Sequence, residues 1–420
     1  QKRRIMAELY SLPNGWEWKK LDDITELITK GTTPTTNGYK FQNSGINFLK
    51  IENIVNGDID LSTIEMFISE EAHQSQKRSQ LQENDVLFSI AGTIGDTAIV
   101  KKEHLPMNIN QAIALIRPKN ILNTFFLKYS LLSIISQNTK DKQRGGAIKN
   151  ISLGDIKDLN YPLPPLEEQK RIVAKLDILF AKIDKAIALH QKNIDEANVF
   201  MASVLNNVFV ELEEKYKYTK LKNAVTKEKT SIKRGPFGSA LKKSFFVEKG
   251  YLVYEQYHAL NNDFSMERYY IDENKFNELK GFEVKAGDII ISCSGAYLGK
   301  LAIIPNDFTK GIINQALLKL SLNKNIIINE LFVYFWNNLM NNGFFDEVKK
   351  GAAIPNMPAV KELKEINIPL PELPIQQKVV SYLDEISQKM EKIKQIQKEK
   401  MQSLKALKAS ILDQAFKGEL

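Results

Sequence analysis

The sequence has very little of what covalent cross-links and metal sites require. Among its 420 residues there is one cysteine, Cys293, and the four histidines stand far apart at positions 73, 104, 190 and 258. A single cysteine excludes an internal disulfide framework and is typical of a reducing compartment, so we expect a cytoplasmic protein. Scattered histidines without a cysteine partner argue against a zinc site. We therefore expect neither a disulfide nor a bound metal.

Long apolar runs and targeting segments are missing as well. The most apolar stretch, 326–336, is interrupted by Asn329 and Glu330 and is too short to span a bilayer, so no membrane partner is expected. The basic residues 1–4 are followed by no apolar core or cleavage site, which argues against a secretion signal. The chain begins with Gln1 instead of methionine, and we expect a trimmed N-terminus.

The motifs that mark common active sites are also missing. No Gly-x-Gly-x-x-Gly occurs, and residues 295–300 (Gly-Ala-Tyr-Leu-Gly-Lys) have one residue too few between the glycines for a phosphate loop. No Asn-Pro-Pro-Tyr or Asp-Pro-Pro-Tyr signature of amino-methyltransferases is present, and no Ser-His-Asp or Cys-His arrangement is visible. We predict that the chain is not an enzyme and binds no cofactor itself. Gly295 and Gly299, like Gly92 and Gly95 in the matching stretch, are interpreted as turn or close-approach positions.

The charge is moderately basic. Lysine and arginine number 58 against 50 acidic residues, which gives a net charge of +8. Such an excess fits a nucleic-acid partner, but many lysine-rich proteins share it. Charge alone therefore does not decide the function.

The chain contains an internal duplication. Residues 85–92 (Asp-Val-Leu-Phe-Ser-Ile-Ala-Gly) return as 288–295 (Asp-Ile-Ile-Ile-Ser-Cys-Ser-Gly), and Asn110-Gln111-Ala112 returns as Asn314-Gln315-Ala316. Residues 145–150 match 351–356, and Pro162-Leu-Pro164 matches Pro369-Leu-Pro371. The offset rises only from 203 to 207, so the matches are collinear and indicate the duplication of a whole domain.

Each copy has the pattern of a mixed domain followed by a long helix. Short alternating runs such as 85–90 and 112–116 predict strands, and 123–138 and 328–341 predict helices. The predicted fold class is α+β: two similar mixed α/β domains separated by two long antiparallel coiled-coil helices, with a pseudo-two-fold internal repeat. The expected segments are a first domain over 1–161, a central spacer helix over 162–216, a second domain over 217–368 and a C-terminal spacer helix over 369–420.

The two helices follow proline-rich segments and carry apolar residues at alternating spacings of three and four. The first seam starts at Ile172 and ends at Leu212, and the second runs from Leu383 to Ile411. These are coiled-coil seams that span roughly 60–70 Å. The helices could join two molecules. We favour pairing within the chain, because each helix follows an equivalent domain; an antiparallel pair would hold the two domains at opposite ends of a rod.

Basic side chains gather in loops at equivalent places of the two copies, where lysine and arginine can neutralise phosphates and neighbouring polar residues can read base edges. For any single lysine, a solvated turn is the alternative. The stretch around Phe48–Asn53 differs strongly from its counterpart at 252–258, and divergent residues on a shared frame are where sequence specificity would lie. The candidate DNA-binding residues are Lys30, Thr32, Thr33, Lys50, Asn53, Lys142, Gln143, Arg144, Lys149, Lys233, Arg234, Ser239, Lys242, Lys243, Tyr254, Gln256, Tyr257, Lys349 and Lys350.

The shared Asn110-Gln111 and Asn314-Gln315 pairs are interpreted differently. Asparagine and glutamine can pair with adenine. Two domains that read different sequences should, however, differ in their base-reading residues. We therefore predict that these identical pairs form buried or turn hydrogen bonds.

The layout resembles a known family. Residues 162–173 (Pro-Leu-Pro-Pro-Leu-Glu-Glu-Gln-Lys-Arg-Ile-Val) and 369–380 (Pro-Leu-Pro-Glu-Leu-Pro-Ile-Gln-Gln-Lys-Val-Val) each open a long helix after a variable domain. With the N-terminal residues 12–21 and the ending 410–420, this arrangement is similar to the specificity subunits of type I restriction–modification systems, over essentially the whole chain.

The resemblance implies a non-catalytic subunit that binds double-stranded DNA. Each domain would read one half of a bipartite, asymmetric site, and the helices would set the spacing. It also implies two modification (methyltransferase) subunits that methylate adenine N6 with S-adenosylmethionine bound to them, and restriction (translocase–nuclease) subunits. The alternative is a coiled-coil scaffold for protein partners without a role on DNA.

Overall fold

In this computed structural model, residues 10–92, 94–142, 151–344, 346 and 356–420 are described. The backbone packs into two compact units, Gln1–Gln191 with Lys398–Leu420, and Lys192–Gln397. Each unit contains one mixed domain and a part of both long helices, α4 (Leu166–Lys215) and α11 (Leu373–Lys417). The four predicted segments divide the chain at other places, and their bounds stay a prediction.

The domain of the first unit is built around an antiparallel four-stranded sheet in the order β2-β10-β7-β8. A smaller sheet in the order β6-β3-β9 contains a parallel pair. The strands have the bounds β1 Glu17–Lys20, β2 Thr25–Lys30, β3 Ile46–Leu49, β4 Ile54–Val55, β5 Asp58–Ile59, β6 Phe67–Ile68, β7 Val86–Ser89, β8 Thr97–Ile99, β9 Met107–Ile109, β10 Ile113–Pro118 and β11 Asn160–Leu163. The shorter helices are α1 Glu70–Ser75, α2 Thr124–Lys142 and α3 Leu153–Lys157.

The domain of the second unit repeats this arrangement. Its main sheet has the order β13-β20-β17-β18, and its smaller sheet has the order β14-β16-β15-β19, again with one parallel pair. The strands have the bounds β12 Tyr218–Lys220, β13 Ile232–Arg234, β14 Phe246–Val247, β15 Tyr251–Tyr254, β16 Tyr270–Ile271, β17 Ile289–Ser292, β18 Leu301–Ile303, β19 Gly311–Ile313, β20 Leu317–Leu320 and β21 Asn367–Pro369. The helices are α5 Leu221–Ala224, α6 Gln256–Asn261, α7 Glu273–Glu278, α8 Asn329–Asn341 and α10 Val360–Leu363.

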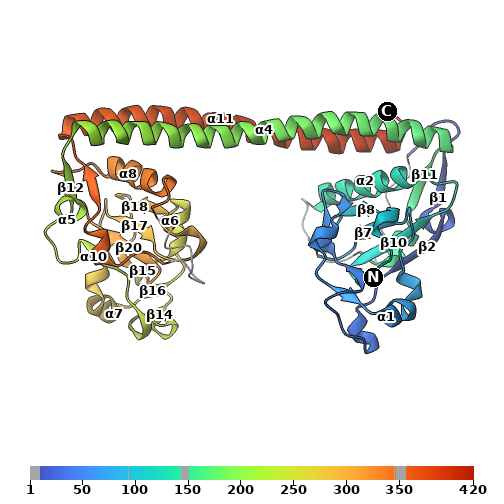
Figure 1. Cartoon of the computed structure of the whole chain (residues 1–420), viewed down its shortest axis with the longest axis horizontal. Helices are drawn as coiled ribbons and strands as arrows, with labels where there is room; N and C mark the ends of the chain where they lie inside the picture. Colours follow the sequence, from blue (N-terminus) through green and yellow to red (C-terminus); the bar gives the residue numbers. More distant parts are fainter. Residues whose placement is uncertain (1–9, 93, 143–150, 345, 347–355) are drawn as a thin grey trace. The chain divides into compact units, whose positions relative to one another are not determined.

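In both domains the main sheet is covered on two faces, which explains the apolar runs of its strands β7 and β17. In the first, Val86 and Phe88 of β7 point into the core shared with α2 and α4, while Leu87 points towards the smaller sheet. In the second, α8 packs between the sheet and the long helices (Figure 1). The predicted strands and helices near 85–90, 112–116, 123–138 and 328–341 are confirmed by β7, β10, α2 and α8.

Within each unit the segments of α4 and α11 run antiparallel. In the first unit Lys408 pairs with Asp184 at 2.8 Å, and Arg171 donates to the backbone oxygen of Leu420 at 2.9 Å. In the second unit Asn198 accepts a hydrogen bond from Lys394 at 3.1 Å. Residue numbers thus rise along α4 as they fall along α11, so the prediction that the helices pair within the chain is confirmed.

A buried glutamine with the same three hydrogen bonds fixes each long helix to its own domain. Gln169 is fully buried; its Nε2 donates to the carbonyls of Ile121 and Pro164, both at 2.9 Å, and its Oε1 accepts from the amide of Asn123 at 2.7 Å. The equally buried Gln376 makes the equivalent bonds to Ile326, Pro371 and Ile328 at 2.8–2.9 Å. We call Gln169 and Gln376 the joint glutamines. Two tyrosines add a second tie, since Tyr129 donates to Asp177 and Tyr334 donates to Asp384.

A buried ion pair supports the first domain, and its loss should be costly. Arg117 contacts Asp85 through two bonds of 2.7 and 2.8 Å, and the Asp85 side chain is 1% exposed. Arg117→Met should lower the free energy of unfolding by about 3–5 kcal/mol, because it leaves a buried carboxylate without its cation. Burial already raises the pKa of Asp85, against the opposing hydrogen bonds from Arg117 and the Gln82 amide. The loss of unfolding free energy in Arg117→Met should therefore be small at acidic pH, where Asp85 is protonated in both the folded and the unfolded chain. It should grow as the pH rises and Asp85 loses its proton.

Urea unfolding of the variant at several pH values tests this. Arg171→Met is the matched control, because Arg171 forms a similar two-bond pair with Glu168 on the exposed surface of α4. Its loss, with that of the one further bond to the Leu420 backbone oxygen, should cost clearly less than the loss of the buried pair, on the order of 1 kcal/mol. Equal losses in the two variants would contradict the role assigned to the buried pair.

Candidate nucleic-acid interface

The matched loops of each domain meet at one edge of its main sheet. Because β13 and β17 both run antiparallel to the strand between them, β20, their carboxyl ends lie beside the start of β20. The first domain has the same arrangement with β2, β7 and β10. We call this the loop edge: residues 31–33, 90–92, 94–95 and 110–112 in the first domain, and 235–239, 293–299 and 314–316 in the second.

A glycine in each domain lets two chain segments cross at the loop edge. A Cβ at Gly31 would lie 1.8 Å from the backbone oxygen of Ile109, and one at Gly235 would lie 1.8 Å from that of Asn314. The first turn of each β7/β17 loop also needs glycine, since Gly92 and Gly295 have φ values of 69° and 78°. These positions confirm that the matched glycines serve turns and close approaches.

The shared asparagines hold this crossing in place. Asn110 Oδ1 accepts from the amide of Ala112 at 3.1 Å, and Asn314 Oδ1 accepts from that of Ala316 at 3.0 Å. Both are turn hydrogen bonds, so the predicted structural role of these asparagines is confirmed. Gln111 accepts a hydrogen bond from Thr33, which ties the two loops of the first domain together.

The first-domain candidates at this edge remain accessible. Lys30 is the last residue of β2 and is exposed, and Thr32 and Thr33 follow it half-buried. Lys50 precedes the turn after β3, where it forms an ion pair with Glu52 at 3.4 Å. Lys30 thus leaves a cation available beside the loop edge, while the Thr33 hydroxyl is already bonded to Gln111.

The second-domain candidates form a denser group. Lys233 lies over the ring of Phe282 at 5.0 Å, and Arg234 lies over the ring of Phe237 at 5.0 Å. Arg234 also donates to the side chain of Asn356, which shows that the Asn at the end of the 351–356 match lies beside this edge. Ser239, Lys242 and Lys243 follow on an exposed loop.

The divergent stretch contributes less than expected. Asn53 is buried; its side-chain oxygen accepts from the Lys50 amide, and its nitrogen donates to Thr63. Tyr254 is also buried, and its hydroxyl donates to the Thr309 carbonyl at 2.6 Å. Both are engaged inside their domains, so we leave them out of the proposed DNA surface. Tyr257 is exposed but bonded to Asp263 at 2.8 Å.

Gln256 joins the loop edge from this stretch. Its Nε2 donates to Ser292 Oγ at 2.6 Å and to the Ser294 carbonyl at 2.7 Å, which leaves its oxygen as the group that a ligand could contact.

The remaining candidates cannot be placed. Lys142 is the last residue of α2, but its side chain is outside what the structure describes. Gln143, Arg144, Lys149, Lys349 and Lys350 lie outside the described residues altogether. Their assignment to DNA binding stays a prediction.

Sequence reasoning missed two aromatic residues at the second loop edge. Phe237 and Tyr297 are 61% and 59% exposed, and they follow β13 and β17. Alignment of the two copies was the available signal, because Thr33 and Ile94 occupy the equivalent places in the first domain. The two loop edges therefore share a frame and differ in the side chains that they present.

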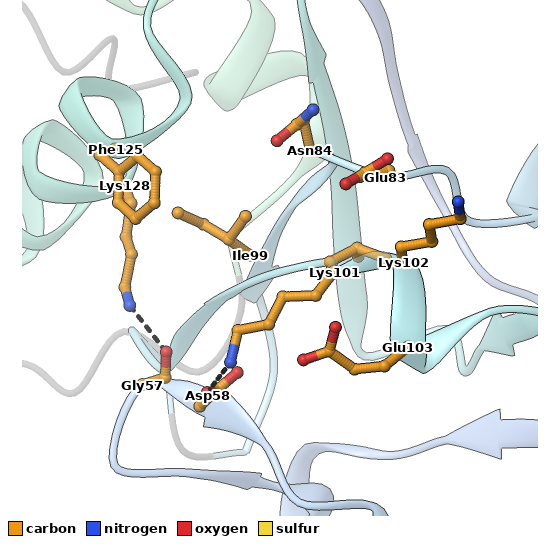
Figure 2. Close-up of a pocket in the computed structure, with 11 residues that line it drawn as sticks. Gly57, Asp58, Glu83, Asn84, Ile99, Lys101, Lys102, Glu103, Phe125 and Lys128 are labelled. Atoms are coloured by element: carbon orange, nitrogen blue, oxygen red, sulfur yellow. Dashed lines mark hydrogen bonds and ion pairs between the residues drawn. The ribbon is translucent and has the colours of Figure 1, made fainter.

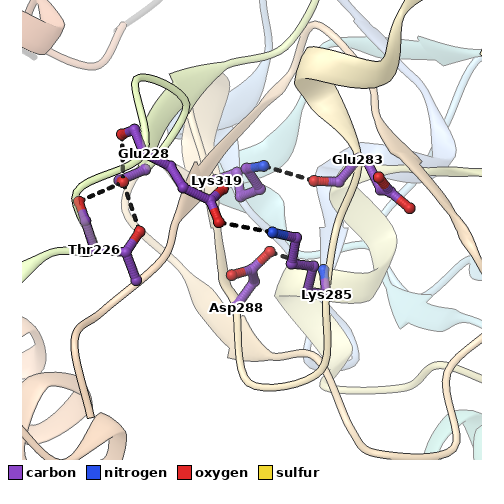
Figure 3. Close-up of polar contacts among 7 residues, drawn as sticks. Thr226, Glu228, Glu283, Lys285, Asp288 and Lys319 are labelled. Atoms are coloured by element: carbon purple, nitrogen blue, oxygen red, sulfur yellow. Dashed lines mark hydrogen bonds and ion pairs between the residues drawn. The ribbon is translucent and has the colours of Figure 1, made fainter. Parts of the chain in front are cut away.

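The opposite end of the second main sheet has a different electrostatic character. There Lys319 is buried and donates to the Glu283 carbonyl at 2.6 Å, while Lys285 pairs with Glu228 at 2.9 Å (Figure 3). Burial lowers the pKa of Lys319, and its carboxylate neighbours Asp288 and Glu228 oppose that shift. The cations drawn there are engaged with protein groups, in contrast to the exposed Lys30 beside the first loop edge and the exposed Lys242 and Lys243 beyond the second.

A hollow of about 400 Å³ in the first domain is lined by lysines and carboxylates of mixed sign. Figure 2 shows Lys101 directed to Asp58 and Lys128 directed to the carbonyl of Gly57, which Lys128 contacts at 2.7 Å. Burial raises the pKa of Asp58, but bonds from Lys101 and the Ile59 amide outweigh it and leave the pKa lowered. Lys101 and Lys128 in this hollow are thus already bonded to protein groups.

The described residues contain neither a membrane-spanning helix nor a cluster of metal ligands. None of the helices in that part of the chain is long and apolar enough to cross a membrane. Over the same residues, no group of three or more His, Cys, Asp or Glu side chains is arranged to hold a metal ion.

Comparison with known proteins defines the class. The family model "Type I restriction modification DNA specificity domain" matches residues 13–199 and again residues 235–400, one match for each copy of the duplication. The chain therefore belongs to the family of type I restriction–modification DNA specificity proteins, the class that the sequence resemblance indicated. Specificity subunits are the non-catalytic components of these systems.

Individual relatives extend over one domain or over the whole chain. The type I restriction enzyme EcoBI specificity subunit of Escherichia coli is 33% identical over 167 residues, which cover 39% of this chain and 35% of that protein. The putative MjaX specificity subunit of Methanocaldococcus jannaschii is 26% identical over 416 residues, covering 95% and 93%. A solved structure described as the structural basis of complex assembly and conformational transition of the type I R-M system has a TM-score of 0.71. It covers 98% of this chain and 100% of its own at 23% identity, and so supports the fold.

Proposed function

We propose that this chain is the DNA sequence-specificity subunit of a type I restriction–modification enzyme, with each loop edge reading one half of a bipartite, asymmetric site. The observation that carries the proposal is the repetition of one edge with different side chains: Lys30 and Thr33 in the first domain, Arg234 and Phe237 in the second. A shared frame with changed contacts is what two readers of different sequences require.

The helices have the complementary role in this proposal. They are the same in both copies where they meet the domains, at the joint glutamines, and so they would set the distance between half-sites. Exposed apolar side chains along α4, among them Ile178, Leu189 and Phe200, would help two modification subunits to dock. Those subunits would bind S-adenosylmethionine and methylate adenine N6, and restriction subunits would join for cleavage. Such an assembly would act on cellular DNA in the cytoplasm.

Methylome sequencing of the host with and without this gene tests the proposal. Loss of one split N6-methyladenine motif on deletion, and its return when the gene is restored, is the expected result. An unchanged methylome in a host that expresses the modification subunits would count against a role in DNA specificity and favour the scaffold alternative.

A further inference from the structure

Arginine is scarce in this chain and is used at defined places. Eight of the 58 basic residues are arginine, and the rest are lysine. Two of the described arginines, Arg117 and Arg171, make two-bond contacts with carboxylates. An arginine fork matches planar acceptors in a way that a lysine cannot, so Arg117 and Arg171 are not interchangeable with lysine at these places.

Arg234 lies at the second loop edge, and its guanidinium group is held there by neighbouring side chains. It is the last residue of β13, directly before the crossing glycine Gly235. The ring of Phe237 lies against its guanidinium group, and Nη2 donates one hydrogen to Asn356. No carboxylate pairs with it among the described residues. The outer end of the fork, Nη1 with the second hydrogen of Nη2, is therefore not used by an acidic partner of the described chain.

The contacts of Arg234 continue across the edge. Asn356 forms a backbone bridge with Ser294, and the Ser294 carbonyl accepts from Gln256. The guanidinium group is thus linked through Asn356 to the 293–299 loop, which limits the number of orientations it can adopt. Preorganisation of this kind favours recognition of one geometry over general attraction to phosphate.

The first domain lacks this arrangement. Its equivalent residue, Lys30, is exposed and has a flexible ammonium group, and Thr33 stands where Phe237 stacks. A single ammonium suits a phosphate contact, whereas the paired donors of arginine match O6 and N7 of guanine in the major groove.

We infer that Arg234 is a specificity-determining residue that reads a guanine in the half-site of the second domain, with Phe237 and Asn356 as positioning residues. This inference rests on the proposed function. It concerns one base pair in one half-site, and the other half-site is independent of it.

Binding selectivity of the complete complex tests the inference. The complex of this chain with its methyltransferase subunits is titrated against a duplex carrying the methylated motif, and against duplexes with each base pair of the second half-site changed in turn. Arg234→Lys should reduce discrimination at one G·C position by about tenfold or more, because a bidentate contact is lost. The salt dependence of binding should stay as in the wild type, because the charge is kept.

Two further variants make the outcome decisive. Phe237→Leu should weaken discrimination at the same base pair, which decides the matter if Arg234→Lys lowers the thermal stability of the complex. Arg268→Lys is the control, since Arg268 stacks on Tyr269 in the same domain and is not part of the loop edge. It should leave every position unchanged.

A phosphate contact would give a different result. Arg234→Lys would then bind all duplexes like the wild type, and Arg234→Ala would weaken binding equally for every sequence with a smaller salt dependence. That pattern, or unchanged discrimination in both Arg234→Lys and Phe237→Leu, would overturn the inference. A wild-type complex that shows no preference for any sequence would instead contradict the proposed function.

Discussion

Replacing Gln376 by leucine should lower the free energy of unfolding of the second domain by about 3 kcal/mol or more. The side chain is fully buried, and leucine fills a similar volume but offers no polar atoms. The carbonyls of Ile326 and Pro371 would lose their donor and the amide of Ile328 would lose its acceptor. Each buried group left without a partner costs about 1–3 kcal/mol. Thermal and urea unfolding of the purified chain measure the loss.

The functional consequence should be confined to one half-site. Gln376 joins the start of α11 to the segment before α8, and Gln169 joins α4 to the segment before α2. Gln376→Leu should therefore relax the second half of the methylated motif, and Gln169→Leu the first. Gln388→Leu is the matched control, because Gln388 is an exposed glutamine on the same helix, and its replacement should change stability by less than about 0.5 kcal/mol. If either variant lost specificity in both halves of the methylated motif, the joint glutamines would not act separately on their own domains.

Removing one heptad from both long helices should shorten the gap between the half-sites while leaving their sequences unchanged. The deletions Asp195–Met201 and Met390–Ile396 fall on facing segments, since Asn193 contacts Gln397 and Asn198 contacts Lys394. Seven residues keep the seam on the same face and remove about 10.5 Å of helix. At 3.4 Å for each base pair, the gap should shrink by up to about three base pairs. The methylated motif gives the gap directly.

Two controls separate length from damage. Deleting five residues from each helix, Asp195–Val199 and Lys392–Ile396, removes less chain but turns the seams away from each other, so assembly should fail. Deleting seven from α11 alone leaves the facing part of α4 without its partner and should also be defective. A functional double-heptad variant with the original gap would contradict the spacer role of the helices.

Much of the frame was predictable because its signals are local. The apolar run of β17 and the three-and-four spacing of α4 report burial within a few residues, and the repeat doubles each signal. The turn role of Asn110 followed from its identity with Asn314. In each case the residues that form the structure are neighbours in the chain.

The finer content of the site depends on distant contacts. Tyr254 is polar and lies in a divergent stretch, which suggested a reader, yet the parallel pairing of β15 with β19 buries it against residues some 60 positions away. The neighbourhood of Arg234 and Asn356 is equally non-local, since the two are separated by 122 positions. No periodicity in the sequence carries that information.

The end of α11 lies against the beginning of the described chain. Tyr10 donates to the carbonyl of Phe416 and stacks edge-on with Trp18, and Gly418 lies against Pro13. In the second unit the equivalent junction is covalent, because α4 ends at Lys215 and β12 begins at Tyr218. The connectivity therefore approaches a closed ring in which one link is made by packing. In such a fold the order of the two domains along the chain can change without changing their contacts. A circular permutant in which Leu420 is joined to Tyr10 and the chain is opened between α4 and β12 should therefore keep the same contacts.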